Sequence, residues 1–96
     1  MKYMKVHWQH ELPEEPILLL SEIDDARWEH RKIYIFRDGA PGIASDAEST
    51  RDVFLSTTPL PSLSEIAADP QFRPEEISKE EFEAAWNEAR RKNGRD

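Results

Sequence analysis

Residues 27–45, RWEHRKIYIFRDGAPGIAS, contain the densest run of strand-forming side chains in the chain, the IYIF of residues 33–36. Asp38-Gly39 comes directly after that run, and an Asp-Gly pair between apolar segments is a strong signal for a β-hairpin. A short return strand is expected at residues 43–44. In the first strand of this hairpin, which ends at residue 36, apolar side chains occupy both odd and even positions, which is typical of a strand covered on both faces. The stretch therefore predicts a hairpin at the centre of a sheet.

Two further strands are expected before this hairpin. Residues 2–10 alternate between apolar and polar side chains, which places Met4, Val6 and Trp8 on one face. Residues 17–23 form a second, mostly apolar strand.

The acidic pair Asp24-Asp25 separates the second strand from the third, which is expected to start near Ala26. A turn this short would place Glu22 opposite Arg27, and opposite charges that face each other across a hairpin help to set its register. An exposed pair of this kind contributes little to stability.

The last third of the chain predicts two helices. A capping box, a serine followed three residues later by a glutamate, starts both a short helix over residues 62–68 and a longer helix over residues 78–93. The longer helix carries an apolar stripe that includes Phe82 and Trp86. Its acidic residues lie near the start and its basic residues near the end, which suits the helix dipole.

The segments between these elements are less regular. Residues 46–52 are polar and predict a loop, and residues 53–55 predict a short edge strand. Residues 57–61 contain two prolines, which remove donors from a strand ladder. Residues 71–77 are interpreted as a linker.

The predicted fold is α+β: an antiparallel sheet of about four strands, packed by a C-terminal helix and a short preceding helix. The whole chain, residues 1–96, is expected to form a single domain. A single apolar core is expected between the sheet and the helices. Its expected members are Met4, Val6, Trp8, Leu18, Leu20, Ile33, Ile35, Phe82 and Trp86.

The composition excludes several classes of protein. The chain has 96 residues, of which 38% are hydrophobic and 34% charged, and no cysteine, so disulfides and thiolate metal sites are excluded. The N-terminal residues lack the apolar run of a signal peptide, and the longest apolar run, ILLL at residues 17–20, is too short to span a membrane. A cytoplasmic protein without a membrane partner is expected.

The net charge of −7, from 20 acidic and 13 basic residues, indicates what the chain binds. It disfavours nucleic acid, which requires a basic surface. It suits an acidic surface that meets a basic protein, with electrostatic steering of the encounter. Plain solubility is the other explanation, and it is the commoner one for an acidic protein.

The three histidines do not predict a metal site. His7 and His10 are three positions apart in an expected strand, so they face opposite ways, and only the fold could bring His30 close to them. A zinc site needs three or four ligands in tetrahedral reach. No metal and no cofactor are therefore expected.

Glu22, Asp24, Asp25 and Glu29 cluster around the turn between the second and third strands, and they are the candidate partner-binding residues. A rigid hairpin beside them would lower the ordering cost of binding. Their spacing is not that of a calcium-binding loop. A solvated turn without a binding role is the alternative.

No catalytic residue is predicted. The GAPG of residues 39–42 lacks the spacing of a phosphate-binding loop, and no serine or threonine of residues 45–64 lies in a nucleophile elbow. Trp8, Trp28 and Trp86 could line a ligand pocket, although in a small domain tryptophans more often form the core.

Many residues together resemble a family of small, functionally uncharacterised bacterial proteins. The resemblance is carried by Lys5-Val6, Trp8, His10, residues 16–24, Arg27-Trp28-Glu29, Arg31-Lys32-Ile33, Ile35-Phe36, Asp38-Gly39, Gly42, Ala44-Ser45, residues 59–63, Glu65-Ile66, Ala68-Asp69-Pro70, Phe72, residues 77–82 and Trp86. The chain departs from the family around residues 49–52, where a glycine-containing turn is expected. The family supplies no catalytic residues, and its small acidic members look like immunity proteins of toxin systems, which is an analogy of type.

The function expected from the sequence is therefore that of a non-catalytic immunity protein or antitoxin, which binds and occludes a basic protein toxin. The alternative is a small-ligand binding or regulatory domain that uses the tryptophan-lined region. An enzyme is the third and least favoured choice. The oligomeric state is left open.

Overall fold

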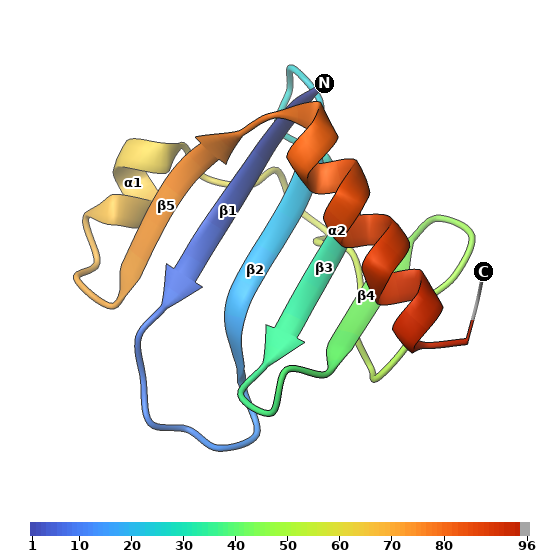
Figure 1. Cartoon of the computed structure of the whole chain (residues 1–96). Helices are drawn as coiled ribbons and strands as arrows, with labels where there is room; N and C mark the ends of the chain where they lie inside the picture. Colours follow the sequence, from blue (N-terminus) through green and yellow to red (C-terminus); the bar gives the residue numbers. More distant parts are fainter. Residues whose placement is uncertain (95–96) are drawn as a thin grey trace.

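The structure is a computed structural model that describes residues 1–94, with five strands and two α-helices (Figure 1). In chain order the elements are β1 (Lys2–Trp8), β2 (Pro16–Ile23), β3 (Glu29–Phe36), β4 (Pro41–Ser45), α1 (Leu63–Ala67), β5 (Phe72–Ile77) and α2 (Lys79–Lys92).

All five strands pair antiparallel in one sheet of order β4-β3-β2-β1-β5. Helix α2 crosses one face of this sheet diagonally, here called the front face, and α1 packs beside β5 (Figure 1). The predicted α+β fold with its two helices is confirmed, but the sheet has five strands and its central strand is β2. The β3–β4 hairpin, expected at the centre, forms one side of the sheet.

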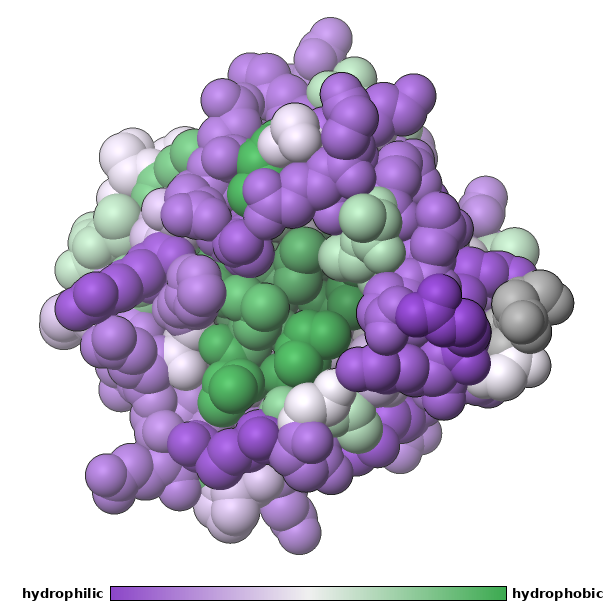
Figure 2. Space-filling view, in the orientation of Figure 1, coloured by the Kyte–Doolittle hydropathy of each residue, from purple (hydrophilic) through white to green (hydrophobic). Residues whose placement is uncertain are grey.

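The core between the sheet and α2 forms around Phe82, which is fully buried. Its ring lies 5.2 Å from that of Tyr3 and 6.4 Å from that of Trp86. Further buried members of the core are Leu20, Ile33, Ile43, Ile77 and Ala89. Because α2 runs diagonally, it leaves Leu18 and Ile35 partly exposed, and an apolar hollow is visible beside the helix (Figure 2).

The expectation of a single core is wrong, because its expected members divide between the two faces of the sheet. Tyr3 and Lys5 of β1 face α2, as shown by Tyr3 against Phe82 and by Lys5 Nζ, 2.7 Å from Glu81 Oε2. The alternation of a strand then places Met4 and Val6 on the opposite face, here called the back face. Both are buried there, in a second apolar layer.

Residues 72–77, interpreted as part of a linker, form the edge strand β5, which pairs along the whole of β1. Pro74 opposes Val6. Gln9 N donates to Gln71 O just beyond this pair, so the residues of β1 that exchange hydrogen bonds with β5 are the odd-numbered ones. Val6 is even-numbered, and the backbone nitrogen of Pro74 opposite it therefore points away from β1, where no N–H is needed. Proline is compatible with such an edge position, and it also blocks the edge against pairing with another chain.

The edge strand expected over residues 53–55 is absent. Val53 is instead 2% exposed, and a tight turn precedes it, in which Val53 N donates to Thr50 O. Arg51 and Asp52 at the centre of this turn have φ of 54° and 57°, the left-handed conformation that glycine adopts without strain. The turn expected from the family is therefore present, with two non-glycine residues at the positions that favour glycine.

Gly42 of β4 is required by the close approach of this turn. A Cβ at Gly42 would lie 2.7 Å from Val53 Cγ2. We expect Gly42→Ala to lower the free energy of unfolding by about 1–3 kcal/mol, because overpacking displaces neighbours in a packed layer. Urea denaturation measures the change.

The matched test removes the clashing group. In a Val53→Ala background, Gly42→Ala should cost much less than in the wild type, because contacting residues are energetically coupled. Equal costs in the two backgrounds would show that the approach of Val53 does not require the glycine.

Candidate partner-binding site

The turn between β2 and β3 is held in one conformation by the side chain of Asp24. Asp24 Oδ1 accepts hydrogen bonds from the backbone N–H of Ala26 at 2.9 Å and of Trp28 at 3.0 Å. Asp24 Oδ2 lies 2.9 Å from His30 Nε2. The hydrogen bond with His30, followed by that from Trp28 N–H, lowers the pKa of Asp24 below its ordinary value. Asp24 thus organises the turn.

Arg27 anchors the same turn to the segment that precedes α1. Its φ is 68°, and its Nε donates to Leu60 O at 2.8 Å while Leu60 N donates back to Arg27 O at 2.8 Å. Arg27 Nη2 donates to Pro61 O at 2.5 Å. The expectation that Arg27 faces Glu22 is therefore wrong, because the turn is longer than two residues and turns Arg27 toward residues 60–61.

A β-bulge follows the turn. Ile23 pairs with Glu29 and Glu22 pairs with Arg31, so His30 is the extra residue on β3. Positions three apart on a regular strand face opposite ways, but the bulge brings Glu29 and Lys32 to the same face. Lys32 Nζ lies 3.0 Å from Glu29 Oε1.

Glu29 is buried, with its side chain 2% exposed. Its Oε2 accepts a hydrogen bond from Ser21 Oγ at 2.7 Å, and its Oε1 accepts one from Ser56 N at 2.9 Å as well as facing Lys32. Both carboxylate oxygens therefore have donors, which is the condition for burying a charge at acceptable cost.

Glu22 belongs to a separate network on the front face. Arg31 donates through Nε to Glu22 Oε1 and through Nη2 to Glu22 Oε2, both at 2.8 Å. The same guanidinium donates to Glu83 of α2 at 3.1 and 2.6 Å, and Tyr3 Oη donates to Glu22 Oε2 at 3.0 Å. Hydrogen bonding to Arg31 lowers the pKa of Glu22 and of Glu83, and both carboxylates raise the pKa of Arg31. The network therefore links β1, β2 and β3 to the helix.

An open hollow lies where these groups meet. Strand β4 pairs with β3 only from Arg31 to Ile35, so on this side the bulged start of β3 has no neighbouring strand, although β2 pairs with it on the other side. The hollow measures about 540 Å³, and its lining residues are Glu22, Glu29, His30, Arg31, Ser45, Asp46, Leu55 and Trp86. We call it the acidic groove, because three of these side chains are carboxylates.

The four candidate partner-binding residues lie around this groove at different depths. Glu22 and Glu29 line it but are buried, at 8% and 7% exposed. Asp24 is linked to it through His30 and is partly exposed, while Asp25 is exposed at the tip of the turn. Their assignment to a partner surface stays a prediction, and among the four only Asp25 is exposed rather than buried or partly buried.

The core position that is the commoner role of tryptophan in a small domain does not apply to Trp28. Its side chain is 44% exposed, directly after the turn. The three tryptophans also do not line a common pocket: Trp86 belongs to the front core, and Trp8 lies against His10 and Phe72, with ring centroids 4.2 and 5.7 Å away. An exposed tryptophan beside acidic residues was missed because hydrophobicity alone assigns it to the interior.

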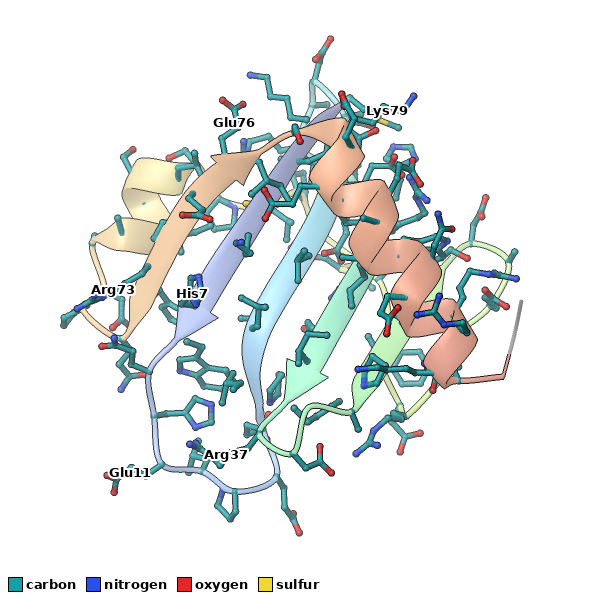
Figure 3. All side chains as sticks on the ribbon, in the orientation of Figure 1. His7, Glu11, Arg37, Arg73, Glu76 and Lys79 are labelled. Atoms are coloured by element: carbon teal, nitrogen blue, oxygen red, sulfur yellow. The ribbon has the colours of Figure 1, made fainter. Side chains whose placement is uncertain are left out.

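The three histidines have separate surroundings. His30 pairs with Asp24, and His10 is bonded to Pro16 O at 2.8 Å and accepts from Leu12 N at 2.9 Å. His7 is exposed on β1, beside Arg73 of β5 (Figure 3). Within residues 1–94 no group of three or more potential ligands is placed to hold a metal ion, and neither described helix is long and apolar enough to cross a membrane.

A family model described as a domain of unknown function, DUF6881, matches residues 2–91. The chain belongs to this family. The match extends from β1 almost to the end of α2, so DUF6881 corresponds to the whole sheet with both helices, including the turn and the acidic groove. We find no match to the chain among curated proteins or among solved structures.

Proposed function

We propose that this protein is an immunity protein or antitoxin, which acts in the cytoplasm by binding a basic toxin domain and occluding it without chemistry of its own. The observation that carries the proposal is the turn after β2. It presents two exposed side chains, the acidic Asp25 and the aromatic Trp28, directly before Glu29 and His30, which line the acidic groove.

Rigidity makes this turn suited to binding. The Asp24 carboxylate, the bond from Arg27 N to Asp24 O and the contacts of Arg27 with residues 60–61 already define its conformation. Ordering a loop at an interface costs free energy, so a turn that is ordered beforehand binds more tightly for the same contacts. Tryptophan is also among the residue types most often found to dominate interface energies.

Charge supports the same partner. The chain carries a net charge of −7, and two aspartates are exposed near this end of the molecule: Asp25 in the turn and Asp46, which follows the Ser45 that pairs with Arg31. A negative surface raises the rate at which a positively charged protein arrives, and the effect decreases with ionic strength. Toxins that attack nucleic acid carry basic substrate sites, which an acidic surface would complement.

The function is tested by searching the genes that neighbour this chain in its host for one that encodes a basic protein, and by expressing that protein with and without the chain. We expect growth arrest by that protein alone, rescue on coexpression, and loss of its activity in vitro when one equivalent of this chain is added. A neighbouring protein whose activity and toxicity are unchanged by the chain would contradict the proposal.

The contact surface is tested with two single variants. Asp25→Asn should slow association and flatten its dependence on salt, because it removes a steering charge. Trp28→Ala should raise the Kd by about 10–30-fold through faster dissociation, as expected for an aromatic hot spot. Both are measured by surface binding kinetics at two ionic strengths.

Matched controls lie at the other end of the sheet. Glu11, in the loop between β1 and β2, is exposed there (Figure 3), and the adjacent Leu12 is 52% exposed. Glu11→Gln and Leu12→Ala should leave both rate constants close to those of the wild type. If the controls change the kinetics and the turn variants do not, the contact lies at the opposite end.

A further inference from the structure

A second hollow lies on the back face of the sheet, between the strands and the segment that contains α1. It measures about 320 Å³, within the range of natural small-molecule sites. Its lining residues are Met4, Val6, Leu19, Ser21, Glu29, Lys32, Tyr34, Leu60, Pro61, Glu65, Ile66, Asp69 and Phe72. We call it the back pocket.

Most of the wall of the back pocket is apolar, with polar groups concentrated on the sheet. Lys32 Nζ donates to Glu29 Oε1 at 3.0 Å and to Tyr34 Oη at 3.3 Å. An ammonium group has three N–H donors and a phenol has one O–H donor. Lys32 Nζ also lies 4.9 Å from the Tyr34 ring centroid. Among residues 1–94 the structure records no oxygen or nitrogen acceptor for the third N–H of Lys32 or for the hydroxyl hydrogen of Tyr34.

These two donors are characteristic of a binding site. A few convergent polar groups in an otherwise apolar pocket are the usual means of orienting a ligand. Lys32 is 7% exposed, so a hydrogen bond made there is well shielded from water. The bulge at His30 creates this arrangement, because it brings Glu29 to the same face as Lys32.

We propose that the back pocket binds an uncharged, mainly apolar small molecule, which presents a carbonyl oxygen to Lys32 Nζ and Tyr34 Oη. Glu29 already neutralises Lys32, so the pocket offers no net positive charge to an anion. Glu65 and Asp69 also line the pocket, and their negative charges further disfavour an anionic ligand. The proposed site does not depend on partner binding, although Glu29 lines both the back pocket and the acidic groove.

The test uses prodan, an uncharged dimethylaminonaphthalene with a propionyl ketone, whose emission shifts to the blue in apolar surroundings. We expect saturable binding to the full chain. Dimethylaminonaphthalene without the acyl group should bind about 25-fold more weakly, because it loses two hydrogen bonds that each contribute about fivefold. The anionic dimethylaminonaphthoate should also bind more weakly than prodan, and tighter binding of this anion would overturn the choice of an uncharged ligand.

Two variants locate the bound probe. Tyr34→Phe should weaken prodan about fivefold by removing the O–H donor, while leaving the affinity for the analogue without the acyl group unchanged. Leu60→Trp should abolish binding of both by filling the back pocket. Circular dichroism verifies that each variant is folded. If Leu60→Trp does not fold, the prodan affinity of Tyr34→Phe relative to wild type still tests whether the probe binds in the back pocket.

The front hollow beside α2 provides the competing site. It measures about 220 Å³ and is lined in part by Leu18, Ile35 and Ala85. Ala85→Trp should fill it without affecting the affinity for prodan. Loss of binding in Ala85→Trp, or equal affinity of Tyr34→Phe and wild type for prodan, would overturn the proposal.

Discussion

Replacing Trp86 with alanine is expected to lower the free energy of unfolding by about 3–5 kcal/mol, the usual cost of removing a large buried aromatic side chain. Trp86 is 7% exposed, and its ring lies 6.4 Å from that of Phe82. The guanidinium of Arg31 lies 5.0 Å from the Trp86 ring centroid and 5.0 Å from that of Phe82. The substitution therefore removes the buried apolar surface of the indole ring and one of the two cation–π contacts that Arg31 makes.

Urea denaturation measures this cost, with Asn87→Ala as the control. Asn87 is the next residue of α2 and is exposed, so its replacement preserves the helix and leaves the core unchanged. We expect the control to stay within about 0.5 kcal/mol of the wild type. A Trp86→Ala midpoint equal to that of the control would show that the indole ring does not stabilise the fold.

The elements that sequence patterns predicted correctly are those determined by neighbouring residues. Asp38-Gly39 forms the expected hairpin, with Gly39 at φ 86°. Ser62 and Ser78 both cap helices by accepting from the N–H three residues on. The reciprocal half of the box forms only in α1, because Glu81 in α2 instead binds Lys5. Local signals therefore predict where a helix starts, while a distant residue can recruit one of the side chains.

The elements that were missed depend on residues far apart in the chain. Strand β5 contains a proline and has little apolar alternation, and it forms because β1 offers it a ladder of six pairs. The burial of Val53 likewise depends on the absence of a side chain at Gly42. Neither contact leaves a pattern within a short window of sequence, so neither could be predicted from propensity alone.

The candidate site was predictable in composition but not in arrangement. The acidic cluster around the turn was evident, yet burial separates its members: Glu22 is bound by Arg31 on the front face and Glu29 by Lys32 on the back face. The cause is the bulge at His30, which shifts the register by one residue. A one-residue shift in a strand exchanges its faces, and nothing in the local sequence marks where the shift occurs.

Replacing Arg31 with methionine is expected to lower the free energy of unfolding by about 2–3 kcal/mol at neutral pH. The substitution retains most of the side-chain volume but removes the guanidinium that binds both Glu22 and Glu83. Glu22, whose side chain is 11% exposed, then carries an uncompensated charge, and breaking a buried pair in this way is strongly destabilising. Partial exposure of the network reduces the cost below that of a fully buried pair.

Two further variants separate charge from packing. Arg73→Met replaces an exposed arginine of β5 and should change stability by less than about 0.5 kcal/mol. Glu22→Gln in the Arg31→Met background should recover part of the loss, because it removes the unpaired charge. If the double variant is as unstable as the sum of both single variants, the loss comes from packing rather than from charge.

The stability lost in Arg31→Met should also depend on pH, in a direction that the pKa shifts determine. Arg31 lowers the pKa of Glu22 and of Glu83 in the folded state. These ion pairs therefore contribute fully to the free energy of unfolding above the unfolded-state glutamate pKa of about 4.3. The contribution is lost as the pH falls through the lowered folded-state pKa values. In Arg31→Met the buried Glu22 is protonated more readily, so acid removes its penalty. The difference in stability between wild type and Arg31→Met should thus narrow between pH ~7 and ~3, as measured by urea denaturation, and a constant difference would show that the ion pairs do not stabilise the fold.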